Sequence, residues 1–300
     1  MCATASRGAT PRAVRPGTLI ANRYRLEHRI SVGASGEIWA ARHDGLDLPV
    51  AVKLLHCSLV GDTKSHTRFR REAKATARIR SENVVEILDL GETEGRPFIV
   101  MEYLEGCDLG SWLDRGTVSI EVAGRIAIGV GRGLRRAHAL GLVHRVLKPA
   151  NIFMAGEGGE TVKIVDFGIA KESRRQPIEM DEPTARGEIL GSPRYMSPEQ
   201  VRGWDLDART DLWALAAVLY RALVGRHAFD GRSVTDVMLA IWHEDPAAPS
   251  ALRPELGPAV DAFFARAFQK RPDMRWPDAD TFVHAFLDAL ARSAPRVRVA

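Results

Sequence analysis

Cysteine is scarce in this sequence of 300 residues, which contains only Cys2, Cys57 and Cys107. Because the three cysteines are odd in number and far apart, the sequence excludes a disulfide framework and offers no paired spacing for zinc. We expect reduced thiols, which favours a cytoplasmic location.

Long hydrophobic runs are also absent. The longest apolar run extends from Leu212 to Tyr220, far short of the ~20 residues that cross a bilayer. Residues 1–22 contain no acidic residue and no apolar stretch of the kind that starts a secretion signal. We therefore expect a flexible basic tail at the N-terminus and no membrane segment in this chain.

The charge balance is only slightly basic, with 42 Lys and Arg against 38 Asp and Glu. Several of the arginines lie near the two ends of the chain, so we expect no nucleic-acid partner. The 45% of hydrophobic residues and 27% of charged residues are typical of a globular protein and exclude wholesale disorder. The length allows two domains or one large domain with two lobes.

The pattern of apolar residues divides the chain in two. Short alternating or apolar runs predict a mostly antiparallel sheet with strands at 24–30, 36–41, 49–55, 84–90 and 97–100. One helix is expected from Ser65 to Arg80, where Phe69, Glu72, Ala75 and Ile79 share one face. Beyond residue 106, helical spacing predicts helices near 123–137, 197–202, 209–225, 233–243, 258–268 and 277–291, interrupted by a hairpin of strands 152–154 and 161–165.

A glycine-containing turn and a lysine in an apolar strand are the first candidate site. Gly33 and Gly36 would let backbone amides approach phosphate oxygens, although many such turns are plain hairpins. Lys53 ends the segment Val-Ala-Val-Lys, where an unpaired charge is costly to bury. Glu72 on the inward face of the next helix is its natural partner, and the alternative is a lysine that reaches the surface.

The most specific motifs come in the second half of the chain. Residues 143–151 are Val-His-Arg-Val-Leu-Lys-Pro-Ala-Asn, and Asp-Phe-Gly follows at 166–168. Together with the glycine turn, Val-Ala-Val-Lys and Ser-Pro-Glu at 197–199, this set resembles the bacterial serine/threonine protein kinases of eukaryotic type over residues 24–293. The resemblance implies an α+β, bilobal protein-kinase fold with a β-rich N-lobe and a helical C-lobe. It also implies a kinase domain at 23–293, divided into an N-lobe (23–101), a hinge (102–104) and a C-lobe (105–293), between tails at 1–22 and 294–300.

The same resemblance implies ATP and Mg²⁺ as cofactors and assigns roles to residues. Lys53, oriented by Glu72, would pair with phosphates of ATP, and Asn151 and Asp166 would supply oxygen ligands to Mg²⁺. The other expected ATP contacts are Ile30, Ser31, Gly33, Gly36, Ile38, Ala51, Met101, Glu102, Leu104, Asp108 and Phe153. Structural roles are implied for an ion pair of Glu199 with Arg275 and for Asp211, which would bond the backbone of the catalytic loop but on its own pattern could equally cap a helix.

The chain departs from the family at one decisive position. Where the family has the aspartate that accepts the proton of the substrate hydroxyl, this chain has Val146, and no acid between Leu142 and Asn151 can replace it. Loss of a general base costs about 10²–10⁴-fold in rate, but Lys148 and Mg²⁺ would still stabilise the transferring group. Two hypotheses follow: a pseudokinase that binds ATP and Mg²⁺ and signals to an unidentified regulatory partner, or a serine/threonine kinase with low turnover on an unidentified protein substrate.

Overall fold

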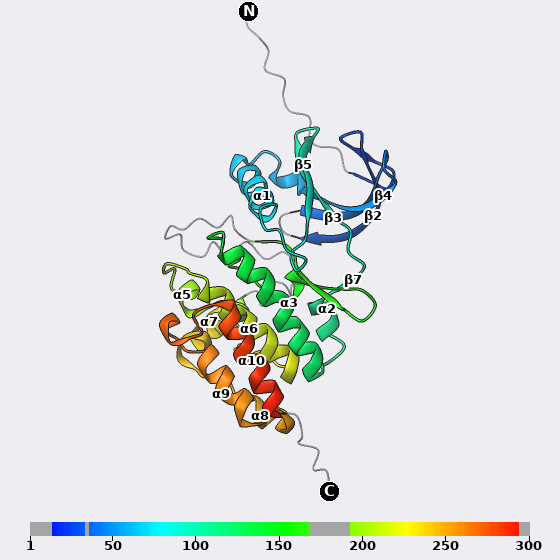
Figure 1. The fold of residues 1–300 in the computed structure, drawn as a ribbon. Helices are drawn as coiled ribbons and strands as arrows, with labels where there is room; N and C mark the ends of the chain where they lie inside the picture. The colour runs from blue at the N-terminus through cyan, green and yellow to red at the C-terminus, as the bar shows by residue number, and fades with distance from the viewer. Residues whose placement is uncertain (1–13, 34–35, 168–192, 294–300) are drawn as a thin grey trace, which may run out of the picture. The chain divides into compact units, whose positions relative to one another are not determined.

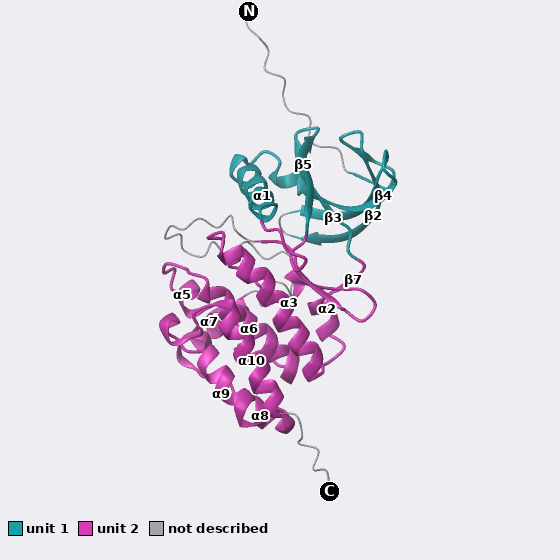
Figure 2. Ribbon diagram, viewed as in Figure 1, with its two compact units in different colours: residues 1–78, 86–104 teal, residues 79–85, 105–300 magenta. Residues whose placement is uncertain are grey.

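The computed structural model describes residues 14–33, 36–167 and 193–293. The chain forms two compact units, of which unit 1 comprises residues 1–78 and 86–104 and unit 2 comprises residues 79–85 and 105–300 (Figure 2). The predicted tail 294–300 and most of the tail 1–22 lie outside the described residues. The domain boundaries expected from the sequence remain a prediction.

Unit 1 contains a six-stranded antiparallel sheet with the order β1-β2-β3-β4-β6-β5 (Figure 1). The strands are β1 (Leu19–Ile20), β2 (Tyr24–Gly33), β3 (Gly36–His43), β4 (Leu48–Leu55), β5 (Ile87–Thr93) and β6 (Arg96–Glu102). Five of them were predicted from alternation, whereas β1 has two residues and is too short to show a period. The predicted strand 84–90 begins late, because Val84 forms an isolated bridge with Ile164 instead of joining β5.

The alternation of side chains gives this sheet two different faces. One face forms an apolar core that contains Trp39, Val52, Leu54, Phe98 and Val100, each at most 4% exposed. Residues between them in the strands point to the opposite face. The two faces therefore separate the residues that stabilise unit 1 from those available for a ligand.

Helix α1 (Thr63–Thr76) buries Phe69 and Ala73. It begins at the N-cap Asp62, whose carboxylate accepts hydrogen bonds from the backbone of Lys64 and Ser65. The predicted continuation to residue 80 is wrong, since the helix ends at the C-cap Ala77 and Ile79 packs in the core of unit 2.

Unit 2 is mostly helical. Its helices are α2 (Leu109–Leu113), α3 (Ile120–His138), α5 (Pro198–Val201), α6 (Arg209–Val224), α7 (Val234–His243), α8 (Pro249–Leu252), α9 (Gly257–Ala267) and α10 (Ala279–Ser293). Apolar residues on all sides make α6 the buried centre, where Trp213 stacks on Phe229 with 5.3 Å between ring centroids. In the part of the chain that the structure describes, no helix combines the length and apolar character needed to span a membrane.

A small antiparallel sheet of β7 (Gly106–Asp108), β8 (Ile152–Ala155) and β9 (Thr161–Ile164) lies against α3. The predicted hairpin of β8 and β9 is confirmed. Two glycines allow the close contact, because a Cβ on Gly129 would lie 2.6 Å from Cβ of Val162 and one on Gly133 would lie 2.8 Å from Cδ1 of Ile164. This packing fixes β9, the strand that leads to Asp166.

Candidate functional site

Part of the predicted site lies on one face of the unit 1 sheet. Ile38 pairs across the strands with Lys53, and Ala51 pairs with Met101. Because directly paired residues and residues two apart share a face, these four side chains point to the same side of the sheet. That side is opposite to the apolar core of unit 1.

Lys53 is only 6% exposed. Its neighbours across the sheet are Ile38 and Ile99, so the ammonium group requires an anion close by. Glu72 belongs to the same unit, on α1, and is half-buried. The ion pair between Lys53 and Glu72 remains a prediction.

The glycine turn has one structural glycine. A Cβ on Gly36 would lie 2.0 Å from the carbonyl oxygen of Leu54, so Gly36 is required for β3 and β4 to approach, whether or not a ligand binds. A Cβ on Gly33 would meet nothing closer than 4.0 Å. Ser31 is exposed, as is Ile30 at 49%, which leaves apolar surface beside the turn.

The predicted base contacts lie at the end of β6. The backbone N–H of Glu102 donates to the carbonyl of Glu86 at 3.0 Å, and its carboxylate accepts from the backbone N–H of Glu86 at 2.8 Å. Since this N–H is already used, a base contact at Glu102 would involve its carbonyl oxygen. Leu104 is the last residue of unit 1 and is half-buried.

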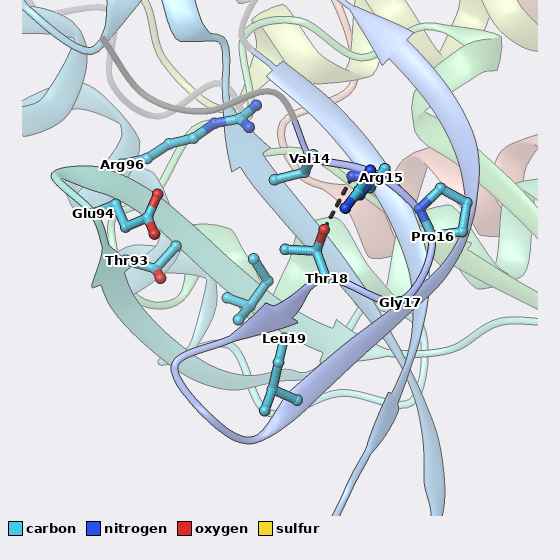
Figure 3. A pocket seen from close by; sticks show the side chains of 10 residues that line it. Val14, Arg15, Pro16, Gly17, Thr18, Leu19, Thr93, Glu94 and Arg96 are labelled. Carbon is cyan, nitrogen blue, oxygen red and sulfur yellow. Dashed lines mark hydrogen bonds between the residues drawn. The ribbon is translucent and has the colours of Figure 1, made fainter. Parts of the chain in front are cut away.

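A cavity of about 330 Å³ lies elsewhere in unit 1. Figure 3 shows it between the segment Val14–Ile20 and the turn from β5 to β6, and none of the predicted site residues lines it. Arg96 lines this cavity and is 2% exposed. Its guanidinium donates to the carbonyl of Leu55 at 2.6 Å and to Glu37 at 2.5 Å, so it links β6 to β4 and β3.

Unit 2 holds the segment His144–Asn151 by its backbone. Asp211 in α6 is fully buried and accepts hydrogen bonds from the backbone N–H groups of His144 and Arg145, each at 2.8 Å. Nε2 of His138 lies 2.8 Å from the same carboxylate. Because Ala208 is the N-cap of α6, Asp211 anchors the loop and is not the helix cap.

Arg145 is held in an unfavourable backbone conformation with φ of +69°. Its carbonyl accepts a hydrogen bond from Nε2 of Gln200 at 2.6 Å, and Oε1 of Gln200 accepts from the backbone of Ser197 at 3.0 Å. A non-glycine residue in this region costs about 1–3 kcal/mol. Gln200 is not among the residues predicted from the sequence, although Ser197 followed by Gln200 is the spacing of a capping box.

Asn151 and Asp166 are placed by β8 and β9. Nδ2 of Asn151 donates to the carbonyl of Val146 at 2.9 Å, and its backbone carbonyl accepts from Val165 at 2.9 Å. This leaves Oδ1 of Asn151 as the side-chain oxygen for a cation. Asp166 is half-buried with φ of +56°. Two oxygen ligands from the protein suit Mg²⁺, because this ion keeps several waters and binds phosphates. A larger metal site is not found, since the described residues contain no group of three or more His, Cys, Asp or Glu that could hold a metal.

The position expected to hold a general base offers none. Val146 is half-buried and Lys148 stands two residues further along the same loop. His144 cannot take over, because it is fully buried with its ring 4.6 Å from that of Phe167. Burial lowers the pKa of His144 although Asp211 and Asp166 act in the opposite direction, so the imidazole is neutral at pH 7.

Asp108 and Phe153 are paired across β7 and β8. Both carboxylate oxygens of Asp108 already accept from Ser111, one from the backbone N–H at 3.1 Å and one from the hydroxyl at 2.6 Å, at the start of α2. A ribose contact by Asp108 would have to share these oxygens. Phe153 is half-buried and points away from its buried neighbours Ile152 and Met154.

Comparisons with known proteins agree with this arrangement. A family model described as "Protein kinase domain" matches residues 24–287. The chain is 39% identical over 271 residues to the serine/threonine-protein kinase PksC of Streptomyces coelicolor, covering 87% of this chain and 48% of PksC. It is 35% identical over 287 residues to PknA of Mycobacterium tuberculosis, covering 94% of this chain and 64% of PknA. The PknI kinase domain of M. tuberculosis, in a crystal structure of its C20A_R136A double mutant, superposes with a TM-score of 0.73 at 26% identity, covering 93% of this chain and 100% of that one. The chain spans about half the length of PksC and of several other curated relatives it matches.

Proposed function

The chain belongs to the protein kinase family and has bacterial serine/threonine kinases as relatives, and from this premise we propose that it is a nucleotide-binding pseudokinase. In this proposal the predicted ATP and Mg²⁺ residues retain their ligands, while phosphate transfer is absent or strongly impaired. The observation that carries it is Val146, a side chain without an acceptor in a loop whose backbone is held by hydrogen bonds at residues 144–146. The regulatory partner and a cytoplasmic location are parts of the same proposal.

The proposed roles follow from the chemistry of the side chains. Lys53, a buried residue of β4, would neutralise charge on the phosphate oxygens of ATP, and Asn151 and Asp166 would hold Mg²⁺. When bound, Mg²⁺ would stabilise negative charge on the phosphates. Lys148 would add a second positive charge near the transferring group. Asp166 is the one carboxylate among these residues, and in this proposal it is assigned to Mg²⁺, so no aspartate at position 146 is present to accept the proton of a substrate hydroxyl.

A second candidate function is a serine/threonine kinase with low turnover. It is favoured by the retention of Lys53, Asn151 and Asp166, because phosphate transfer depends mainly on positioning and electrostatics. Both candidate functions require nucleotide binding. They differ in how far Val146 lowers the rate of phosphate transfer.

Nucleotide binding is tested by thermal unfolding. We expect millimolar ATP with Mg²⁺ to raise the melting temperature, since a ligand at 100 times its Kd adds about 2.7 kcal/mol to the free energy of unfolding. Lys53→Met should remove most of the increase, and Arg132→Met, which removes a positive charge at an exposed position of α3, should not. Unchanged melting of the native chain with nucleotide would contradict both candidate functions.

A further inference from the structure

The exposed face of α1 in unit 1 is strongly basic. Lys64, Arg68, Arg70, Arg71 and Lys74 are all exposed, and Arg78 is exposed just past the C-cap. At about 100° per residue the five helical cations occupy an arc of roughly 160°, opposite the buried Phe69 and Ala73; Ala75, near the C-terminal end of the same arc, is buried. We call these five residues, together with Arg78, the basic face. The only acid within the helix is Glu72, which lies outside this arc.

This arrangement is unfavourable for an isolated helix. Lys64 with Arg68 and Arg70 with Lys74 are like charges four residues apart, a spacing that destabilises a helix. The N-cap Asp62 supplies the negative charge that the helix dipole favours at this end, and the first turn adds no further acidic residue. Arg70 lies 3.4 Å from Glu92, but both side chains are more than 40% exposed, so water and salt weaken this pair. An anionic partner would relieve the repulsion along the helix.

The side chains of the basic face restrict the class of partner. None of the exposed large hydrophobic residues of the described chain lies on α1. The face therefore lacks the apolar groups that insert into a bilayer and the aromatic rings on which single-stranded bases stack. It therefore offers a partner only positive charge.

The length of the basic face and its flank favour a short ligand. The 14 residues of α1 span about 21 Å, the length of roughly six residues of an extended peptide. Glu92 and Glu94 lie at the turn from β5 to β6, and α1 contacts both of those strands. These carboxylates would repel any anionic chain that continued past the helix, whether a nucleic-acid duplex or a longer acidic peptide.

We propose that the basic face of α1 docks an acidic segment of about six residues from a partner protein. Arginine suits this ligand, because a guanidinium can bind a carboxylate through two hydrogen bonds, and Arg68 and Arg78 lie at exposed positions of the basic face. The basic face contains none of the residues predicted to bind ATP or Mg²⁺, although Glu72 lies elsewhere on the same helix.

The test measures binding of a fluorescent peptide of six glutamates by anisotropy at several salt concentrations. The variant Lys64→Gln/Arg68→Gln/Lys74→Gln should bind at least ~10-fold more weakly, with a shallower salt dependence. The matched control is Arg132→Gln/Arg135→Gln/Arg136→Gln, which removes the same charge from exposed positions of α3, where Arg132 pairs with Glu82 and Arg135 with Asp280. The control should bind as the native chain does.

Three results would overturn the proposal. The first is no binding of the peptide at low salt, and the second is an equal loss in both triple variants, which would show a response to net charge alone. The third is tighter binding of a DNA duplex than of the peptide, lost only in the α1 variant, which would assign the basic face to nucleic acid. Melting temperatures of both variants are measured alongside, and because repulsion is removed, the α1 variant should be no less stable than the native chain.

Discussion

Replacing Val146 with aspartate is expected to raise the rate of phosphate transfer from ATP by about 10²–10⁴-fold. The gain corresponds to roughly 3–5 kcal/mol of activation free energy, because the new carboxylate would accept the proton of the attacking hydroxyl and orient that group. The measurement is transfer of labelled phosphate to a generic basic protein and to the chain itself, with Mg²⁺ present.

The structure explains why one substitution should suffice. The hydrogen bonds that hold the loop go to backbone atoms: Asp211 binds the N–H groups of His144 and Arg145, Gln200 binds the carbonyl of Arg145, and Asn151 binds the carbonyl of Val146. No side-chain contact of residue 146 is needed to keep this shape. Val146 is also half-buried and not enclosed, so a carboxylate there keeps part of its hydration and stays ionised at pH 7.

Two control variants make the result specific. Val146→Asn has the same size and shape as the aspartate variant but no basic oxygen, and it should leave the rate near that of the native chain. Adding Lys53→Met to Val146→Asp should abolish the transfer. If the native chain already transfers phosphate in a way that depends on Lys53, and Val146→Asp does not increase it, the pseudokinase proposal is wrong and the low-turnover kinase is favoured.

Local patterns predicted the elements of unit 1 well, because side-chain alternation is a property of neighbouring residues. The run that contains Ala51 and Lys53 was expected to be a strand, and the register of β4 puts both residues on one face. The residue types of segment 143–151 likewise predicted a catalytic loop that lacks a general base. The sequence could not place its backbone, because φ of +69° at Arg145 depends on Asp211 and Gln200, more than 50 residues away.

The contacts that define the two units could not be predicted from local sequence patterns. Residues 79–85 interrupt unit 1 in sequence but belong to unit 2, because Ile164 exchanges backbone hydrogen bonds with Asn83 and Val85. The helix was predicted to continue to residue 80 because Ile79 fits its apolar spacing, yet this side chain is buried in a different core. Periodicity shows that a residue will be buried but not which part of the molecule buries it.

The ion pair between Glu199 and Arg275, expected from the family resemblance, is present. Breaking it should have a large effect on the free energy of unfolding. Two hydrogen bonds of 2.8 Å join the carboxylate and the guanidinium, and the side chains are 3% and 1% exposed. Thr210 donates to the same carboxylate at 2.9 Å. We expect Glu199→Gln to lower the free energy of unfolding by about 3–5 kcal/mol, because Arg275 then keeps a buried charge without a counter-ion. Chemical denaturation at pH 7 measures this change.

The same variant should change the pH dependence of stability. Burial alone would raise the pKa of Glu199, but the hydrogen bonds and charge of Arg275 hold this pKa below its ordinary value of 4.5. A carboxyl group with a lowered pKa in the folded state stabilises the protein above pH 4.5 and loses this contribution as the pH falls through the folded-state pKa. The difference between the native chain and Glu199→Gln should therefore be full at neutral pH and shrink below pH 4.5.

An exposed ion pair gives the matched control. Arg271 and Asp273 lie 2.6 Å apart but are 77% and 54% exposed, so Asp273→Asn should cause no measurable loss of stability. An equal loss of stability in Glu199→Gln and Asp273→Asn would contradict the assignment of the effect to burial.

The buried ion pair is also connected to the candidate site through the backbone, because Glu199 directly precedes Gln200, whose side-chain amide donates to the carbonyl of Arg145. Loss of the ion pair should therefore loosen the loop at Val146 before the whole unit unfolds, and faster hydrogen exchange at the backbone N–H groups of His144 and Arg145 would report it.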